Sequence, residues 1–348
     1  MTTRARTIRA RAQAGLWAAD PNGFAPSAER AALWDTRVRA GLARSLKDVF
    51  RSLDRDAADP AHARFLAAVE TGPVRPAVFA GYVELVLAVF EDRVGDAHAL
   101  ADELLAASTA VEAPMRPLPL DDVALGPGVA GRYARLISDD ALIAIAPASP
   151  EAVARAAPGV EAGLDLLRRG APDVWAEVRA LIREIVVVSG QVGGPDLNIA
   201  AASCFSLWGA LILVADKLGE PLDAALVLAH EAAHTHLFGL AEGGVLVENP
   251  DDERRPAPFR SDLRPLEGLA HAAFVYARTA YACDALLRSG ALSADEAAEA
   301  ERQLKRSREG WRQAADTVEA HGRFTPAGRQ ALAGARHYMA DGLRPTPA

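Results

Sequence analysis

The chain has 348 residues, enough for one large domain or two smaller ones with a substantial core. Half of the residues are hydrophobic and 24% are charged, so the composition excludes wholesale disorder and the fibrous classes. The 38 basic and 46 acidic residues leave a net charge of −8. Because phosphate neutralisation needs a cationic surface, this balance argues against a general nucleic-acid binder.

The cysteine content and the hydropathy indicate a cytoplasmic protein without membrane segments. Cys204 and Cys283 are far apart and lack CxxC spacing, so neither a disulfide framework nor a thiolate zinc site is expected. The longest apolar run, Leu207 to Ala215, has nine residues, less than half of what a membrane-spanning helix needs. We expect a solvated or fraying helix at the N-terminal arginines, which are Arg4, Arg6, Arg9 and Arg11.

The first half of the chain predicts mainly helices. Apolar residues recur at helical spacing from Ser27 to about Ala107. Six prolines between Glu112 and Pro150 make long helices improbable there and favour a connecting layer with short strands such as Leu142 to Ile145. The helical pattern resumes over 150–170 and again over 172–182, and each stretch opens on a proline that suits the first turn of a helix.

The centre of the chain predicts a small sheet followed by a helix. A β-branched run at Ile185 to Val188 and an apolar stretch at Ser203 to Val214 are typical of strands, with a glycine-rich turn near 193–195 between them. Leu222 to Leu240 predicts a helix. The segment 241–263, which is dense in proline and charge, is expected to be irregular.

The C-terminal part predicts helices again. Pro265 suits the first turn of a helix that runs to about Arg288. Ser293 and Glu296 form a capping-box pattern ahead of a long polar helix. Thr325, followed by a proline, is expected to open the last helix.

An HExxH motif, His230-Glu231-Ala232-Ala233-His234, lies inside the helix expected over 222–240. Two histidines four residues apart lie one turn apart on the same helical face, so both imidazoles can reach one metal ion while Glu231 flanks it. In a chain with eight histidines, a chance occurrence of this motif has a probability of roughly 1%. The surrounding run is apolar, where two unpaired imidazoles would be expensive. We therefore predict a metal site on this helix.

The third ligand decides the class of metal site. A metzincin would need glycine and histidine where this chain has Leu237 and Leu240, so that class is excluded. The next helix offers Glu267 and His271, themselves four residues apart. Glu267 as the ligand would give a gluzincin-like zinc peptidase in which Glu231 is the base that activates water. His271 as the ligand would give an all-nitrogen site.

Two arginines and a further histidine accompany the motif. Arg278 and Arg264 each lie seven residues from His271, two helical turns away, so both could point towards the metal. There a guanidinium could bind the far carboxylate of a chelating dicarboxylate. Alternatively, each arginine pairs with a loop carboxylate such as Asp251, Asp252, Asp262 or Asp284. His236 is turned well around the helix from His234, and we expect it to support the site from behind or to lie at the surface.

Several segments together resemble one known family. The segments are Trp175, Ser203–Ser206, the HEAAH helix, Phe259–His271 and Phe274–Arg278. They look like the HExxH-type peptide β-hydroxylases, which were earlier labelled HExxH-containing peptide modification proteins and are associated with ribosomally made peptides. The resemblance is clearest over Trp175 to Ala282, 108 of the 348 residues.

The resemblance implies iron(II), 2-oxoglutarate and dioxygen in place of zinc hydrolysis, and hydroxylation of a side-chain β-carbon in a precursor peptide. It places His230, His234 and His271 on iron, which departs from the usual set of two histidines and one carboxylate. It also makes Arg278 and Arg264 the candidates for holding the distal carboxylate of 2-oxoglutarate. Other peptide-maturation enzymes become possible partners.

Glu231 and the predicted sheet receive different roles under this resemblance. Because oxygenation needs no water-activating base, Glu231 would orient a ligand or a bound water instead. The strand expected at Ser203 to Val214 is the candidate for pairing with an extended peptide, although a plain core strand is the alternative. The N-terminal helices could complete the peptide groove or bind a leader sequence.

These observations predict an α+β, mostly α-helical protein in which a metallopeptidase-like HExxH helix packs on a small β-sheet. We expect a helical N-terminal region over 1–170, a metal-binding catalytic core over 171–290 and a C-terminal helical cover over 291–348. Two rivals to the hydroxylase remain: a zinc peptidase that uses the same histidines, and a non-catalytic peptide-binding partner of a maturation enzyme.

Overall fold

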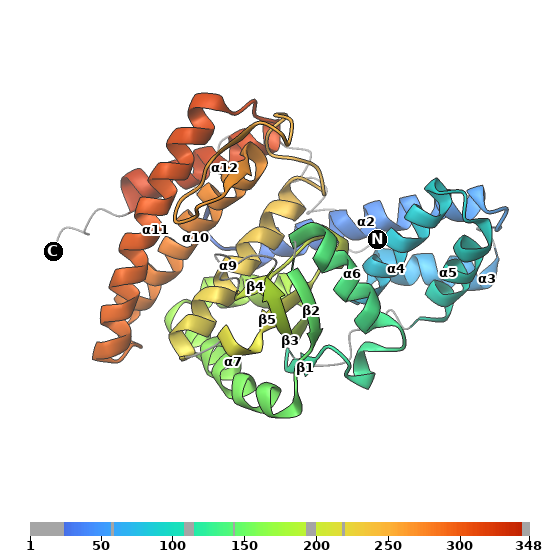
Figure 1. The fold of residues 1–348 in the computed structure, drawn as a ribbon, viewed down its shortest axis with the longest axis horizontal. Coiled ribbons are helices and arrows are strands. Elements are labelled where there is room, and N and C mark those ends of the chain that lie inside the picture. The colour runs from blue at the N-terminus through green and yellow to red at the C-terminus, as the bar shows by residue number, and fades with distance from the viewer. Residues whose placement is uncertain are drawn as a thin grey trace.

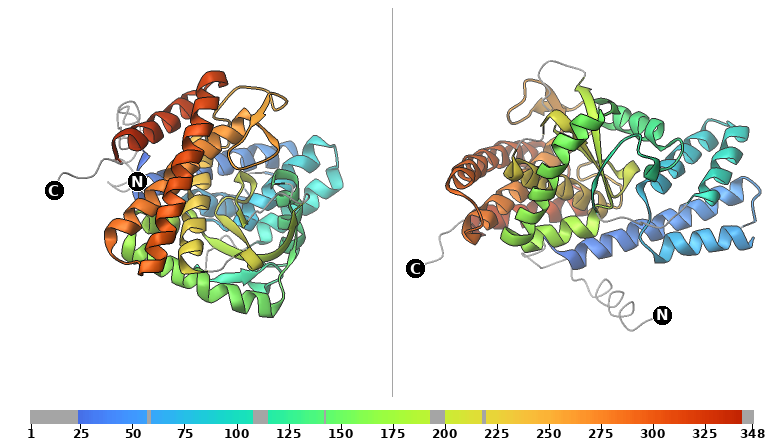
Figure 2. Two further views of the ribbon diagram at one scale, coloured as in Figure 1. Left: turned by 60° about the vertical axis from the view of Figure 1, so that its left-hand side comes forward. Right: turned by 90° about the horizontal axis from the view of Figure 1, so that it is seen from below.

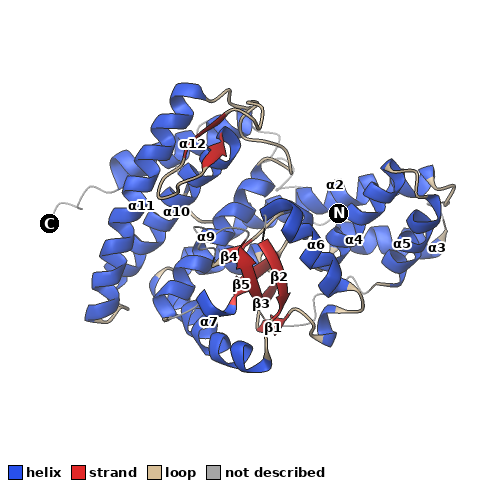
Figure 3. Ribbon diagram, in the orientation of Figure 1, coloured by secondary structure: helices blue, strands red, loops and turns tan. Residues whose placement is uncertain are grey.

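The structure is a computed structural model that describes residues 24–56, 59–107, 115–141, 143–192, 200–217 and 220–342. Over these residues 11 α-helices pack around a small mixed β-sheet (Figures 1 and 3). The predicted mostly α-helical α+β fold is therefore confirmed. The N-terminal arginines and the turn expected near 193–195 lie outside the described residues.

The first helices form a lobe at one end of the molecule (Figure 1). They are α2 (Ala28–Ser52), α3 (Pro60–Thr71), α4 (Pro76–Phe90) and α5 (Val94–Ala106). Ser27 caps α2 by accepting the N–H of Arg30, and Asp59 caps α3 by accepting the N–H of Ala61. Along α2 every third or fourth residue is apolar and buried, namely Trp34, Val38, Leu42, Leu46 and Phe50. The helical prediction for this region holds.

The proline-rich segment forms short strands, as predicted, but also a helix that the prolines had argued against. Strands β1 (Pro117–Pro119) and β2 (Ile143–Pro147) flank helix α6 (Val129–Ala141). The helix fits because the stretch between Pro127 and Pro147 is free of proline. Leu142, the expected start of the second strand, lies outside the described residues. Two predicted helices follow, α7 (Pro150–Gly170) and α8 (Pro172–Leu181).

Strand β3 (Glu184–Val192) is the centre of the sheet. It pairs with β1 and, on its other side, with β5 (Ala210–Val214) in parallel, while β2 joins its second half in antiparallel fashion. Strand β4 (Ala201–Ala202) pairs antiparallel with the outer side of β5. The strand expected over Ser203 to Val214 is thus shorter than predicted, because a 3-10 turn at Phe205–Leu207 interrupts it. The strand does not offer a free edge: β5 is buried and paired on both sides, as the alternative of a core strand predicted, and β4 is the outermost strand on that side among the described residues.

The C-terminal half follows the sequence prediction closely. Helix α9 (Pro221–Leu240) contains the HExxH motif, and the irregular segment after it holds a hairpin of β6 (Arg254–Pro256) and β7 (Leu263–Pro265). The last helices are α10 (Leu266–Ser289), α11 (Ala294–His321) and α12 (Pro326–His337). Helices α10 and α11 lie side by side (Figure 2). The predicted capping box is present: Ser293 and Glu296 exchange hydrogen bonds at the start of α11.

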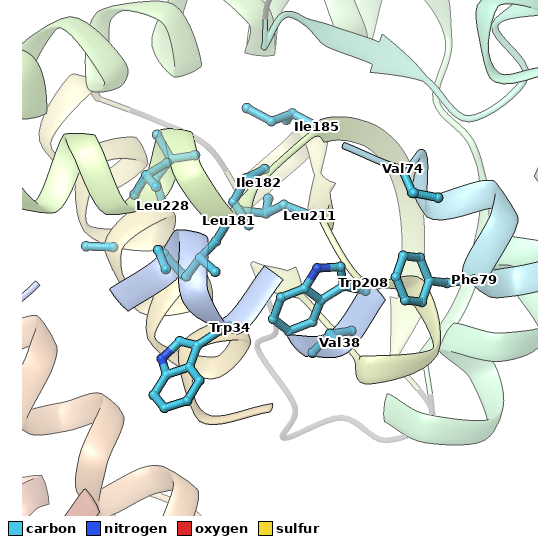
Figure 4. Packing of buried hydrophobic residues seen from close by; sticks show 14 of the residues in the cluster. Trp34, Val38, Val74, Phe79, Leu181, Ile182, Ile185, Trp208, Leu211 and Leu228 are labelled. Carbon is cyan, nitrogen blue, oxygen red and sulfur yellow. The ribbon is translucent and has the colours of Figure 1, made fainter. Parts of the chain in front are cut away.

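Helix α9 lies at the centre of the packing, with α7, α8, α10 and α2 all against it. Trp34 of α2 and Trp208 are 1% exposed and pack with Leu228 of α9 in the main core (Figure 4). The close approach needs Gly239, since a Cβ there would lie 2.6 Å from Trp34 Cβ and 2.9 Å from the Trp208 ring. In the part of the chain that is described, no helix is both long and apolar enough to cross a membrane.

This close contact gives the first testable prediction. Gly239→Ala should lower the free energy of unfolding by about 1–3 kcal/mol, because the added methyl group forces the two indoles away from α9. The intrinsic helix propensity of alanine acts in the opposite direction. Denaturant unfolding measured by circular dichroism tests the expected loss.

Gly95→Ala in α5 is the matched control, since a Cβ there would meet nothing within 4 Å. That variant should be as stable as the parent or slightly more stable. Equal stability of both variants would show that the packing of α2 on α9 tolerates a larger separation than the structure implies.

Candidate functional site

The HExxH motif lies in the middle of α9, where the sequence placed it. Proline at the first turn starts the helix, and the residues before the motif are apolar on nearly every side, which suits a helix enclosed by neighbours. His230 and His234 are partly exposed, whereas Glu231 between them is 5% exposed. One face of the motif is therefore open to solvent, and the glutamate lies inside.

Three imidazoles meet between α9 and α10. The ring centres of His230 and His234 are 5.1 Å apart, and those of His234 and His271 are 5.6 Å apart with nearly parallel planes. The Nδ1 atoms of His234 and His271 are 3.3 Å apart. The structure thus brings together the three histidines that the sequence singled out, one of them from a helix that begins 26 residues after α9 ends.

Glu267 holds His271 from behind. Its Oε1 lies 3.3 Å from His271 Nε2, and its carboxylate accepts the backbone N–H groups of Leu246 and Val247 at 3.0–3.1 Å. Although burial opposes it, these bonds and His271 lower the pKa of Glu267. The carboxylate beside Nε2 of His271 favours the tautomer that carries its proton on Nε2. The lone pair of His271 Nδ1 then faces His234.

The environment keeps two of the imidazoles neutral. Burial lowers the pKa of His230 to about 4. Burial, together with the charges of His230 and His271, lowers the pKa of His234 well below its ordinary value. Neutral imidazole is the form that binds a metal ion, so near neutral pH these groups are ready to act as ligands.

The spacing of His234 and His271 fits two ligands of one ion. Two nitrogens bound at about 2.0–2.1 Å to a common ion lie about 2.8–3.4 Å apart, from octahedral to tetrahedral geometry. The observed 3.3 Å falls in that range and is long for a hydrogen bond between two neutral rings. Among the described residues no three such side chains already surround one point.

Buried Glu231 and half-buried Ser203 form a hydrogen-bonded pair beside the histidines. The Ser203 hydroxyl, which directly follows β4, donates to Glu231 Oε2 at 2.7 Å. Burial raises the pKa of Glu231 to about 7, and the hydrogen bond from Ser203 opposes this rise. The carboxyl group can therefore hold or release a proton near neutral pH. Ser203 belongs to a segment that carries the family resemblance, but no pattern in the sequence indicated this contact.

Arg278 does not face the histidines, which corrects the prediction that it binds a ligand carboxylate. It is 4% exposed; its guanidinium contacts the Glu177 carboxylate of α8 and donates to the carbonyl oxygen of Phe24 at 2.8 Å. Arg278 lies two helical turns, about 10 Å, along α10 from His271. At that position the neighbouring helix is α8, and its Glu177 is the partner of Arg278. The alternative prediction, an ion pair with a loop carboxylate, is also wrong, because the partner Glu177 is a buried residue of helix α8.

His236 belongs to the same buried cluster. Its Nδ1 lies 3.4 Å from Glu177, and its ring stacks on Phe274 at 5.6 Å. At 2% exposed it is not a surface residue, and the contacts described for it are with Glu177, Phe274 and Trp34, so neither expected position describes it. The Ser27 N–H also donates to Glu177 at 2.9 Å. The cluster ties the start of α2 to α8, α9 and α10.

Glu177 is the main residue that sequence reasoning missed. It lies on the inner face of α8 with Val174, Val178 and Leu181. Burial opposes its ionisation, but Arg278, His236 and the Ser27 N–H together lower its pKa to about 2. The sequence signal for this ion pair is a glutamate at the spacing of the buried apolar residues of α8. A carboxylate at such a position is expected to be buried and therefore to need a cationic partner.

Arg264 has the weaker attachment of the two arginines. It lies on β7, its side chain is 40% exposed, and its Nη1 is 3.6 Å from Asp262. This loop carboxylate is one of those that the sequence left open as its partner. An exposed ion pair of this length adds little stability, so Arg264 can exchange partners at low cost.

Comparison with known proteins adds no family assignment: no family model matches the chain, and no curated protein matches its sequence. The resemblance to the peptide β-hydroxylases therefore stays a prediction that depends on the residues themselves.

The buried cluster gives the second prediction. Arg278→Met should lower the free energy of unfolding by about 3–5 kcal/mol, because it leaves the Glu177 carboxylate buried without its cation. Arg288→Met on the same helix is the control, since Arg288 is exposed and pairs with Asp284 one turn away. That control should cost at most about 1 kcal/mol. Denaturant unfolding at pH 7 compares the two.

Acid unfolding provides an independent check on the same carboxylate. The folded-state pKa of about 2 lies below the ordinary value of 4.5, so the stabilisation from ionised Glu177 is complete above pH 4.5 and is lost as the pH falls towards 2. Glu177→Gln should flatten this part of the stability profile. An unchanged profile, or equal losses in the two arginine variants, would show that the ion pair is not the stabilising interaction.

Proposed function

We propose that this protein is an iron(II)- and 2-oxoglutarate-dependent hydroxylase that acts on a side-chain β-carbon of a ribosomally synthesised peptide. The observation that carries the proposal is the contact of His230, His234 and His271, with Glu267 engaged behind His271. The family resemblance over 175–282 supports the same reading.

The position of Glu267 favours a nitrogen-rich metal site over the gluzincin arrangement. Its carboxylate already accepts two backbone N–H groups and contacts Nε2 of His271. To become a ligand it would have to turn Oε1 away from His271 and bind the metal through the lone pairs that the two backbone N–H groups leave. As an orienting carboxylate it fixes the imidazole instead, the arrangement in which ligating histidines are commonly found.

Each residue around the proposed metal would have a separate role. His230, His234 and His271 would hold iron(II), which with 2-oxoglutarate and dioxygen supplies the oxidant for the carbon–hydrogen bond. Glu231, paired with Ser203, would hold a proton on the inner side of the site. Partial exposure of the first two histidines leaves an open flank for the substrate.

Arg264 and β4 are the proposed contacts of the cosubstrate and the peptide. Arg264 is the remaining candidate for the distal carboxylate of 2-oxoglutarate, because Arg278 is engaged with Glu177. Strand β4 is the edge of the sheet and leads into Ser203, which contacts Glu231. A peptide that adds to this edge would pass beside the motif, which favours a peptide over a small-molecule substrate.

A zinc peptidase is the second candidate, and one observation favours it. Glu231 sits between two histidines with its carboxyl group buried and hydrogen-bonded, the position of the water-activating base in HExxH peptidases. This candidate would require Glu231 for every turnover. The non-catalytic alternative requires no metal at all, so the finding of stoichiometric metal in the purified protein would argue against it.

Reconstitution provides the third prediction. With iron(II), ascorbate, 2-oxoglutarate and air, pooled synthetic peptides should gain the mass of one oxygen atom, and succinate should form. With zinc alone the same peptides should stay intact. His234→Ala should abolish both products, because one of the three ligands is gone. Peptide cleavage that needs no 2-oxoglutarate would replace the hydroxylase with the peptidase.

Glu267→Gln tests the metal site itself and is the fourth prediction. Loss of the orienting carboxylate should weaken metal binding about 10–100-fold, measured by competition with a chromogenic chelator. Glu242→Gln, an exposed site on the loop after α9, is the control and should leave the affinity unchanged. If Glu267→Gln and the control bind metal equally well, His271 does not depend on this carboxylate and the proposed ligand set fails.

Glu231→Gln separates the two candidate reactions and is the fifth prediction. In a hydroxylase this variant should keep metal binding and retain activity within about tenfold, because no general base is needed. In a peptidase the same change should cost about 100-fold or more. Glu253→Gln in the loop before β6 serves as the comparison, since Glu253 bonds only with Asn249 and neighbouring arginines in the described contacts.

A further inference from the structure

The turn between α4 and α5 exposes large apolar side chains. Leu87 is 45% exposed, Phe90 is 84% exposed and Val94 is 54% exposed, all within eight residues of sequence. Leu87 and Phe90 lie three residues apart, on the same side of the end of α4. Exposed apolar groups that gather at one corner, as opposed to being scattered singly, mark surfaces that contact another molecule. We call these three residues the α4–α5 corner.

A cavity of about 560 Å³ adjoins this corner. Helices α4, α5 and α6 form its walls, and Leu87 belongs to both the corner and the cavity. Leu100 and Leu136 contribute apolar surface, and Glu84 and Glu103 contribute carboxylates. The volume is that of a pocket which accepts one or two large side chains, and a groove between helices is the form that receives an amphipathic helix.

The charges at the turn beside the cavity favour a cationic occupant. Within the cavity Glu84 and Glu103 are balanced, because Arg132 contacts both and Arg135 contacts Glu84. The turn carries three carboxylates, Glu91, Asp92 and Asp96, and one arginine, Arg93, which bonds with Glu91 and Asp96, so two negative charges remain there. The Asp96 side chain is 62% exposed, so part of this charge faces solvent.

The cavity is separate from the histidine site. Helices α4 and α5 lie at one end of the molecule, whereas α10 lies towards the other (Figure 1). None of the residues that line the cavity contributes to the contacts of His230, His234 or His271. An occupant of this cavity would thus be recognised away from the proposed chemistry.

We propose that the α4–α5 corner and its cavity form a docking site for an amphipathic peptide helix that presents large apolar side chains beside lysine or arginine. An apolar side chain of the peptide enters the cavity next to Leu87, and others cover Phe90 and Val94. The basic side chains face the exposed carboxylates of α5. Binding at this site needs no metal, so it is independent of the reaction proposed above.

The probe for this site is a fluorescein-labelled helical peptide of about 14 residues with a leucine and phenylalanine stripe on one face and lysines on the other. Fluorescence anisotropy in metal-free buffer measures its dissociation constant on the full chain. The double variant Phe90→Ser/Val94→Ser should raise that constant about tenfold or more, because it removes the apolar surface that binding would bury. Both side chains are exposed, so folding should be unaffected, as circular dichroism will show.

Two comparisons make the test specific. Val123→Ser removes an apolar side chain that is 94% exposed outside the corner, and it should leave the dissociation constant unchanged. A probe with glutamate in place of lysine should bind at least about fivefold more weakly at low salt, and the difference should shrink at high salt.

Three outcomes would overturn the proposal. They are an unchanged dissociation constant in the double variant, an equal loss in Val123→Ser, and equal binding of the acidic probe. Light scattering tests the alternative occupant, a second copy of this chain. Self-association that the double variant abolishes would show that a second copy occupies the α4–α5 corner and would also overturn the proposal. These outcomes do not depend on whether the protein is a hydroxylase, because the binding assay contains no metal.

Discussion

The packing of α10 on α9 is the constraint on which the candidate site depends. Neither helix alone can hold a metal ion, because the motif supplies two imidazoles and the third comes from across the interface. Bringing three imidazoles together under partial burial keeps two of them neutral, so the site favours a cation over additional protons. Glu267 then directs the third ring, since it fixes His271 through Nε2 and is itself fixed by backbone N–H groups.

A second set of contacts holds the same helix pair from the other side. Two residues along α9 correspond to a rotation of about 200°, so His236 faces away from His234 and meets Glu177 and Arg278 in the core. This cluster reaches the backbone of Phe24 and Ser27 and therefore joins the start of α2 to the two helices that carry the histidines. The charges are fully enclosed, so their arrangement tolerates little displacement without loss of ion pairing.

The sequence could predict what depends on local spacing. The four-residue spacing in HExxH places His230 and His234 on one face in any helix, and Ser293 with Glu296 forms a capping box wherever α11 begins. The pairing of Arg278 could not be predicted, because its partner lies 101 residues earlier in the chain. The seven-residue spacing correctly places Arg278 and His271 on one face of α10. It does not indicate which neighbouring helix packs against that face two turns beyond His271. The sheet edge was missed for the same reason, because strand order is set by tertiary pairing.

The choice between a peptidase and an oxygenase follows from which groups remain uncommitted. In a peptidase of the gluzincin type the carboxylate of the second helix binds the metal, whereas Glu267 faces Nε2 of His271 and accepts two backbone N–H groups. Under the proposed function His271 is the donor from α10, and an ion held there would have three neutral nitrogens and no carboxylate. Such a set leaves more positive charge on the metal than a set with one carboxylate, and an anionic cosubstrate that chelates through its own carboxylate would supply the missing charge. The commitment of Glu267 thus connects the local hydrogen bonding at the start of α10 to the kind of cosubstrate that the centre favours.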